Sequence, residues 1–324
     1  MNHEPAAHTS RTFAVGQLPS GGSIDVVEHT YRGAEGPTVS VIAGQHGIEL
    51  NGTAVARRLG DRLSTMSIAG TVRVLPVANP PAMDHRSYMG PAAYDVVNPN
   101  LNRVWPGDSD GTLTERIAAY LWDRLADSDA IVDLHSGTPE MLTHVRYCDD
   151  GTTADRLATA FGVAHLLVDE PPKSDPPRTT LRNAASQAEI PALTVELANS
   201  REVATEAVAA GLEGVTNVLK TMGMVPGDIE NTPTQQVLRD DIPAVCLSSA
   251  GLFEPASRVT VGDHVQVGTV LGTVHNPETF ELVETITADR SGFVYSLSRG
   301  GANAAGERVA SLASRASTAD TEQD

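Results

Sequence analysis

Residues 38–49 read TVSVIAGQHGIE and join two kinds of predicted structure. The β-branched run over residues 38–44 ends in glycine, which is typical of a buried strand. Residues 49–66 then place apolar side chains at helical spacing. A buried strand that leads directly into a helix is the building unit of an α/β sheet, so this stretch sets the expected fold class.

The same alternation continues on both sides of this unit. Further strands are predicted at residues 22–30, 71–78, 129–134, 163–168 and 191–197, and further helices at 114–126, 153–161, 180–189 and 202–222. Alternating strands and helices predict an α/β fold with a mostly parallel or mixed sheet and helices on both faces. We place this α/β domain at residues 13–224, after an N-terminal segment of residues 1–12 that we expect to be disordered.

The pattern changes after about residue 240. Residues 261–276, VGDHVQVGTVLGTVHN, have the valine and glycine rhythm of short strands joined by tight turns. We therefore expect a smaller all-β sandwich or barrel domain at residues 225–312. An acidic tail, expected to be disordered, follows at residues 313–324.

Charge and composition exclude several classes of partner. The chain has 324 residues, a net charge of -18 and 40% hydrophobic residues. A strongly negative surface repels phosphate backbones and anionic lipids, so neither nucleic acid nor a membrane is expected as a partner. No secretory signal or membrane-spanning run is present, and we expect a cytoplasmic protein. The acid excess and the scarcity of lysine are typical of salt-adapted intracellular proteins, although compositional drift would give the same pattern.

Two of the predicted strand ends carry side chains of the types that bind zinc in proteins. His46 and Glu49 are spaced i, i+3, so they face the same side of a helical turn. His135 follows the strand at residues 129–134, and Asp133 is placed on the same face to hydrogen-bond an imidazole. Two histidines and a glutamate form the ligand set of a catalytic zinc site with an open fourth position. We predict one Zn²⁺ per chain, while noting that His46 alone would more often be a turn histidine.

A third strand end carries Glu196, after the otherwise apolar residues 191–195. A buried carboxylate without a partner is costly, which argues against a purely structural role. Near an activated water, Glu196 could act as the general base.

The loop at residues 98–107, NPNLNRVWPG, connects the two ligand segments. One interpretation is a loop held together by asparagine hydrogen bonds and a buried tryptophan. The other is a carboxylate-binding site in which the Arg103 guanidinium makes two parallel hydrogen bonds beside Asn102.

Taken in order, the motifs HGIE, NLNRVWPG, DLHSG and TVELA resemble the succinylglutamate desuccinylase and aspartoacylase family, which is related to the zinc carboxypeptidases. The resemblance covers residues 38–300. It implies that His46, Glu49 and His135 bind zinc and that Glu196 is the general base. It further implies that substrate contacts and oxyanion stabilisation come from Asn102, Arg103, Arg86 and Arg182.

The roles of the last two arginines rest on a weaker match. The resemblance implies that Arg86 polarises the scissile carbonyl, but its surroundings depart from the family spacing, and His85 and Tyr88 are alternatives. Arg182 is a second candidate contact for the substrate carboxylate. Ile48, where many family members have a polar residue, leaves the substrate identity open.

The sequence thus predicts a zinc-dependent hydrolase that cleaves the amide bond of a small, carboxylate-bearing N-acyl amino acid. A zinc carboxypeptidase acting on short peptides and a non-catalytic binding protein are the alternatives. A metal-independent amidase using Ser136 is disfavoured, because the sequence around it is not a nucleophile elbow. Whether the chain forms a homo-oligomer is left open.

Overall fold

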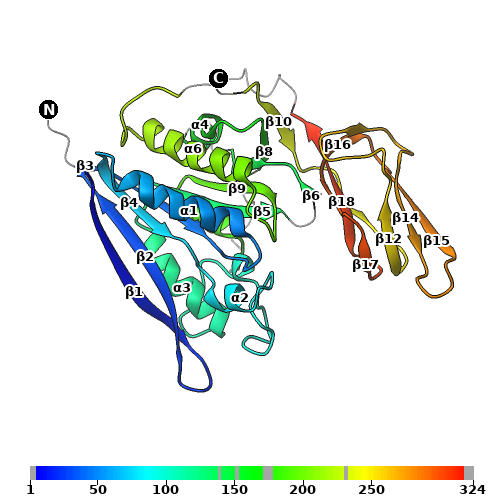
Figure 1. Ribbon diagram of the computed structural model, residues 1–324, viewed down its shortest axis with the longest axis horizontal. Coiled ribbons are helices and arrows are strands. Elements are labelled where there is room, and N and C mark those ends of the chain that lie inside the picture. The colour runs from blue at the N-terminus through cyan, green and yellow to red at the C-terminus, as the bar shows by residue number, and fades with distance from the viewer. Residues whose placement is uncertain (1–4, 138–139, 150–152, 171–177, 230–232, 317–324) are drawn as a thin grey trace.

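A large mixed sheet forms the body of the molecule (Figure 1). The computed structural model describes residues 5–137, 140–149, 153–170, 178–229 and 233–316. In spatial order the main path of the sheet contains β1 (Ala7–Gln17), β2 (Ser23–Arg32), β4 (Ala69–Leu75), β3 (Ala34–Ala43), β5 (Ala130–Gly137), β9 (Ala192–Asn199), β7 (His144–Cys148), β8 (His165–Asp169), β10 (Gln236–Arg239), β18 (Arg308–Arg315), β16 (Gly292–Leu297) and β13 (His264–Val265). Two short strands, β11 (Val245–Cys246) and β6 (Glu140–Met141), pair with β18 and β16.

The centre of this sheet is parallel. Strand β3 pairs in parallel with β4 and β5, and β5 pairs in parallel with β9. Antiparallel pairs follow on each side, such as β2 with β4 and β7 with β9. The carboxyl ends of β3, β5 and β9 therefore lie next to one another at one edge of the sheet.

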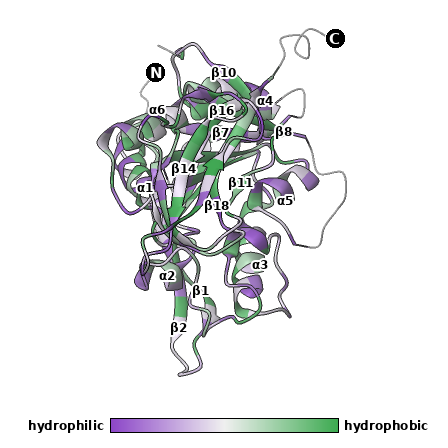
Figure 2. Cartoon of the chain, turned by 90° about the vertical axis from the view of Figure 1, so that its right-hand side faces the viewer, coloured by the Kyte–Doolittle hydropathy of each residue, from purple (hydrophilic) through white to green (hydrophobic). Residues whose placement is uncertain are grey.

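Helices cover both faces of the sheet, as Figure 2 shows for α1 and α6 on one side and α3 and α5 on the other. The helices are α1 (Leu50–Leu63), α2 (Pro80–Asp84), α3 (Leu113–Leu125), α4 (Thr153–Phe161), α5 (Leu181–Gln187) and α6 (Thr205–Thr221), with a 3₁₀ turn η1 at Leu101–Arg103. Buried side chains of β3 alternate between two cores: Val39 and Val41 pack with α1, α4 and α6, whereas Ile42 packs with α3 and α5. The predicted α/β class with two-sided helix cover is confirmed.

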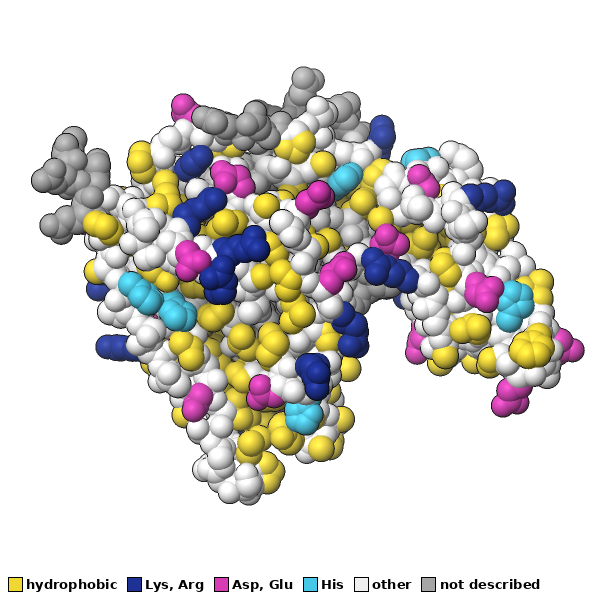
Figure 3. All heavy atoms as spheres, in the orientation of Figure 1, with side chains coloured by type: hydrophobic (Ala, Val, Ile, Leu, Met, Phe, Trp, Pro, Cys, Tyr) yellow, Lys and Arg dark blue, Asp and Glu magenta, His cyan; other side chains and the backbone are white. Residues whose placement is uncertain are grey.

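The C-terminal lobe consists of two sheets that face each other. The smaller, antiparallel sheet has the order β15 (Leu282–Thr287), β14 (Val270–His275), β12 (Gly251–Pro255) and β17 (Gly301–Asn303). Its inward side chains share a core with those of β11, β13, β16 and β18. Figure 3 shows the lobe at the right, with a hollow between it and the body on this face. The smaller β-rich domain was predicted correctly.

The ends of the chain are more ordered than the sequence predicts. The expected disorder of residues 1–12 is wrong for residues 7–12, which belong to β1 and pair with β2. Disorder over residues 313–324 is wrong for residues 313–315, which end β18 and pair with β10. Backbone pairing stabilises both segments although most of β1 is exposed. Residues 1–4 and 317–324 lie outside the described residues.

The boundary after residue 224 stays a prediction. Strand β10 follows that point, yet it pairs in parallel with β8 of the large sheet. The large sheet thus continues from the body into the C-terminal lobe.

Candidate metal centre

Three adjacent strand ends bring the predicted ligands together. After β3, the chain turns at Gly44, whose φ is +66° and where a Cβ would lie 3.0 Å from the Val77 Cα. His46 and Glu49 follow this turn, and His135 lies near the end of neighbouring β5. One ligand atom from each of these three side chains lies within 4.8 Å of the others.

The two imidazoles are oriented toward the same carboxylate. His46 Nδ1 lies 2.9 Å from Glu49 Oε1, and His135 Nδ1 lies 2.8 Å from Glu49 Oε2. On the outer side, His46 Nε2 lies 3.2 Å from Asn100 Oδ1 and His135 Nε2 lies 2.9 Å from Asp133 Oδ2. Both outer partners are oxygen acceptors, which favours a proton on each Nε2, so that each Nδ1 can offer its lone pair to a metal.

The charges of this buried group also fit a divalent cation. Burial would raise the pKa of Glu49, but the His135 and His46 rings hold it at about 2. Burial opposes protonation of His135, yet Asp133 and Glu49 raise its pKa well above the usual range. The Glu49 and Asp133 carboxylates therefore favour a positive charge at the centre. The Nδ1 atom of His46 lies 2.9 Å from Glu49 Oε1 without the geometry of a hydrogen bond. These donors fit Zn²⁺, which binds imidazole nitrogen and carboxylate oxygen.

Gln45 holds the metal-facing groups in place, a role that the sequence analysis missed. Its Nε2 donates to both oxygens of Asp133, at 2.9 and 2.8 Å. Its Oε1 accepts a 2.8 Å hydrogen bond from Nε1 of the fully buried Trp105. The predicted contact of Asp133 with an imidazole is present, and Gln45 fixes that carboxylate from behind. Its position directly before His46 was the one signal that could have indicated this role.

Glu196 lies opposite His135 in the parallel register of β5 and β9. The side chain is only partly exposed, and its Oε2 is buried without a hydrogen-bond partner. Burial raises its pKa to about 7; Glu49 and Asp133 add to the rise, while His135 opposes it. A carboxyl group with this pKa can accept and release a proton near neutrality.

The predicted substrate-binding pair reaches the same place from η1. Asn102 Nδ2 lies 3.4 Å from His135 Nε2, and Asn102 Oδ1 accepts a 2.9 Å hydrogen bond from the Leu181 backbone N–H. Arg103 is exposed, and its Nη1 donates to the Asn102 carbonyl at 2.6 Å. Asn98 and Asn100 also cap backbone N–H groups in this loop, so the loop is both held by asparagines and placed at the metal centre.

Tyr88, one of the alternatives to Arg86, packs directly on the centre. Its ring stacks on His46 with centroids 3.9 Å apart and an interplanar angle of 15°. Burial raises the pKa of its hydroxyl, with Glu49 and Glu196 adding to the rise and Arg103 opposing it. The phenol therefore stays protonated and can donate a hydrogen bond.

The structure places the other two predicted arginines differently. Arg86 is exposed with a φ of +50°, and its side chain makes no hydrogen bond or ion pair within the described ranges. Arg182 is buried, with its Nη2 2.5 Å from Asp169 Oδ2 and its Nη1 3.1 Å from Thr194 Oγ1. Arg86 is thus free to meet a ligand, whereas the charge of Arg182 is already matched by Asp169. Their roles in catalysis and substrate binding stay predictions.

A charged network behind Glu196 links the centre to the C-terminal lobe. Arg146 Nε and Nη2 each lie 2.8 Å from Asp169, and Nη2 also lies 2.6 Å from Asp240 Oδ2. The hydroxyl of Tyr295, on β16, donates to Asp240 at 2.9 Å. Arg146 on β7 lies opposite Thr194 of β9, two residues from Glu196 on the same face, and its positive charge lowers the pKa of Glu196.

Comparison with known proteins identifies the family. Residues 35–222 match the model of the succinylglutamate desuccinylase/aspartoacylase catalytic domain. The chain belongs to this family. Its members are amide-hydrolysing deacylases, and the fold described above is the family fold.

Individual members resemble the chain over most of its length. It is 30% identical over 268 residues to the N-alpha-acetyl-L-2,4-diaminobutyric acid deacetylase of Halomonas elongata, covering 79% of this chain and 75% of the relative. A succinylglutamate desuccinylase/aspartoacylase structure from Rhodobacter sphaeroides matches with a TM-score of 0.84 and 25% identity, over 97% of both chains. The product-bound ectoine utilization protein EutE (DoeB) of Ruegeria pomeroyi matches with a TM-score of 0.83 and 24% identity, over 96% of both chains. None of the helices that the structure describes is long and apolar enough to cross a membrane.

Proposed function

We propose that the chain is a zinc-dependent deacylase that hydrolyses the amide bond of a small N-acylated amino acid. The observation that supports this most is the buried group of His46, Glu49 and His135, with Glu196 in register beside His135. A zinc-dependent amide hydrolysis needs three metal ligands and a proton-transfer group close together, and these four residues would supply them. Zn²⁺ in such a site acts as a Lewis acid that activates water and polarises a carbonyl oxygen.

Protein side chains would transfer the proton and stabilise the oxyanion. Glu196 takes a proton from water as the water oxygen bonds to the acyl carbon, and it delivers that proton to the nitrogen as the C–N bond breaks. The products are the carboxylate of the acyl group and a free amino acid. The protonated Tyr88 hydroxyl, beside His46, and the exposed guanidinium of Arg86 are the candidate donors to the developing oxyanion.

The substrate carboxylate is assigned to Asn102 and Arg103. Asn102 lies next to His135, and Arg103 presents a guanidinium to solvent beside it. A guanidinium binds a carboxylate with two parallel hydrogen bonds, which would fix the acyl group over the metal ligands. Because the Halomonas relative deacetylates a diamino acid, we propose an N-acetylated diamino acid as the first substrate to test.

The test combines metal analysis with hydrolysis of a substrate panel. The panel contains N-acetyl-2,4-diaminobutyrate, N-acetylaspartate, N-succinylglutamate and a short peptide, each with the wild type, Glu196→Gln and Glu206→Gln. Glu206 is an exposed residue of α6 and serves as the matched control. We expect about one zinc per chain in all three proteins, and kcat lowered about 10²–10⁴-fold in Glu196→Gln alone.

Two results would contradict the proposal. One is a Glu196→Gln variant as active as the Glu206→Gln control. The other is a zinc-loaded wild type that hydrolyses no N-acyl amino acid of the panel. Preferential removal of the C-terminal residue from the peptide would instead favour the carboxypeptidase alternative.

A further inference from the structure

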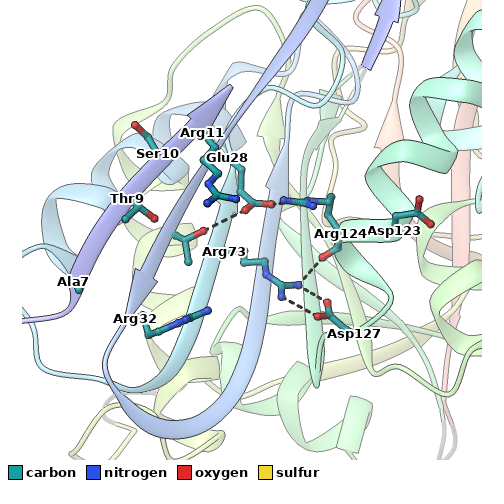
Figure 4. Close-up of a pocket in the computed structure, with 11 residues that line it drawn as sticks. Ala7, Thr9, Ser10, Arg11, Glu28, Arg32, Arg73, Asp123, Arg124 and Asp127 are labelled. Carbon is teal, nitrogen blue, oxygen red and sulfur yellow. Dashed lines mark hydrogen bonds and ion pairs between the residues drawn. The ribbon is translucent and has the colours of Figure 1, made fainter. Parts of the chain in front are cut away.

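A cavity lies at the end of the sheet opposite the metal centre. It has a volume of about 690 Å³ and is bounded by β1, β2, β4 and the C-terminal end of α3 (Figure 4). Asp127, on its wall, comes just before β5 begins, whereas His135 lies near the carboxyl end of that strand. The cavity therefore does not belong to the proposed active site.

Four arginines line this cavity in a chain whose net charge is -18. Two of them already have partners. Arg73 pairs through both terminal nitrogens with Asp127 and also donates to the Arg124 carbonyl at 2.7 Å. Arg124 Nε lies 3.6 Å from Glu28 Oε2, and its guanidinium lies 4.3 Å above the Phe13 ring. These contacts orient the two groups without help from a ligand.

Among the described residues, the other two arginines have no hydrogen-bond or ion-pair partner, although Arg11 lies opposite Glu28 in the register of β1 and β2. Arg11 and Arg32 are exposed, and within the described part of the chain neither makes a hydrogen bond or an ion pair. The one lining acid not used by Arg73 or Arg124 is Asp123, whose carboxylate points away from the arginines in Figure 4. The cavity therefore keeps an excess of positive charge.

The register of the strands makes the arginines converge. Thr30 on β2 pairs with Thr9 on β1 and with Arg73 on β4, so these three residues share a row. Arg11 and Arg32 lie two residues to either side of that row on the same face, because side chains alternate along a strand. Figure 4 shows Arg11, Arg32 and Arg73 extending toward the same space.

We propose that this cavity binds a compact anion made of linked phosphate groups, such as pyrophosphate or tripolyphosphate. Guanidinium groups that approach from three strands match the oxygens of a phosphate, which point in several directions, better than the two coplanar oxygens of a carboxylate. The volume exceeds that of one phosphate group. None of the described residues that line the cavity is aromatic, so the lining offers no ring on which a base could stack.

The test is calorimetric titration of the zinc-loaded full chain with pyrophosphate, tripolyphosphate, citrate and ATP at constant ionic strength. The variants are Arg11→Gln/Arg32→Gln and a control, Arg57→Gln/Arg290→Gln, which removes the same charge from exposed positions outside the cavity. We expect saturable binding of pyrophosphate or tripolyphosphate to the wild type and the control, weakened at least about tenfold in Arg11→Gln/Arg32→Gln. Zinc chelation by these anions would affect all three proteins equally.

Three results would overturn the proposal. They are the absence of saturable binding at millimolar concentrations, equal affinity in the Arg11→Gln/Arg32→Gln variant and the wild type, and tighter binding of citrate than of either phosphate compound. If ATP binds more tightly than tripolyphosphate, the site also recognises the nucleoside, and the assignment to an oligophosphate without a nucleoside is wrong. Deacylase activity is not part of this readout, so failure here leaves the proposed function untouched.

Discussion

At the scale of single residues, the metal centre depends on groups that set the direction of each imidazole. Asp133 accepts from Nε2 of His135 and itself receives two hydrogen bonds from Gln45. This leaves Nδ1 of His135 facing Glu49. In the proposed zinc site, the Asp133 carboxylate would therefore contribute to metal binding without being a ligand.

Replacing that carboxylate should weaken the metal site. In Asp133→Asn, an amide NH₂ would face either the Gln45 NH₂ or the protonated Nε2 of His135, so the imidazole loses its fixed orientation. We expect zinc affinity to fall about 10–100-fold, measured by competition with a chelator. Asp123→Asn, on the exposed side of α3, is the control. An unchanged affinity would show that Asp133 does not orient His135.

His144 gives a prediction about stability and pH. The residue is buried, its Nδ1–H donates to the Leu142 carbonyl at 2.9 Å, and burial lowers its pKa from 6.5 to about 4. Its contribution to stability is therefore present above pH 6.5 and is lost as the pH falls toward 4, because the unfolded chain binds the proton more readily. The difference between the pKa values of His144 in the unfolded and folded states corresponds to about 3 kcal/mol of stability.

Urea unfolding between pH 7 and pH 4 measures this contribution of His144 to the free energy of unfolding. The free energy of unfolding of the wild type should fall by about 3 kcal/mol more than that of His144→Gln over this range. Parallel pH curves for the two proteins would mean that His144 is not held neutral in the folded state.

At the scale of elements, the sequence predicted those strands and helices whose apolar spacing is regular. It missed β1, which is mostly exposed, and β7, whose residues His144 and Arg146 face a buried charged network instead of an apolar core. The strand ends that carry His46, His135 and Glu196 were predicted for the same reason as the strands themselves. The sequence named Tyr88 only as an alternative and did not single out Gln45, because the stacking of Tyr88 on His46 and the hydrogen bonds of Gln45 to Asp133 and Trp105 are tertiary contacts.

The packing of α6 on α4 supplies a test at this scale. A Cβ at Gly214 would lie 2.2 Å from Cε1 of the Phe161 ring, so the two helices can approach only with glycine there. We expect Gly214→Ala to lower the free energy of unfolding by about 1–3 kcal/mol in spite of the better helix propensity of alanine. Gly214→Ala/Phe161→Leu should cost less than the sum of the two single changes. Strict additivity would contradict the steric explanation.

At the scale of the whole molecule, the catalytic body and the C-terminal lobe share one sheet. Strand β10 pairs with β8 on one side and with β18 on the other, and Tyr295 of the lobe bonds to Asp240 beside Arg146. The glycine and valine rhythm predicted a separate β domain, but it could not show that strands of that domain extend the catalytic sheet. The lobe is thus a structural part of the catalytic unit.

Truncation tests this dependence. A chain that ends at residue 224 would expose β8 as an unpaired edge and leave the Arg146 network without Asp240. We expect this chain to aggregate or to lose hydrolysis, whereas a chain that ends at residue 316 keeps the full sheet and full activity. Size-exclusion chromatography and the hydrolysis assay decide between these outcomes. A monodisperse, active 1–224 fragment would show that the body does not need the lobe.

The most direct test of the central claim is zinc titration of metal-depleted protein. Hydrolysis of the best N-acyl substrate is followed as zinc is added to the wild type and to a His46→Ala/His135→Ala variant. We predict that activity is absent without metal, rises linearly to a break at about one zinc per chain, and does not return in the variant. Full activity in rigorously metal-free wild type would contradict the assignment of His46, Glu49 and His135 as the ligands of a catalytic metal.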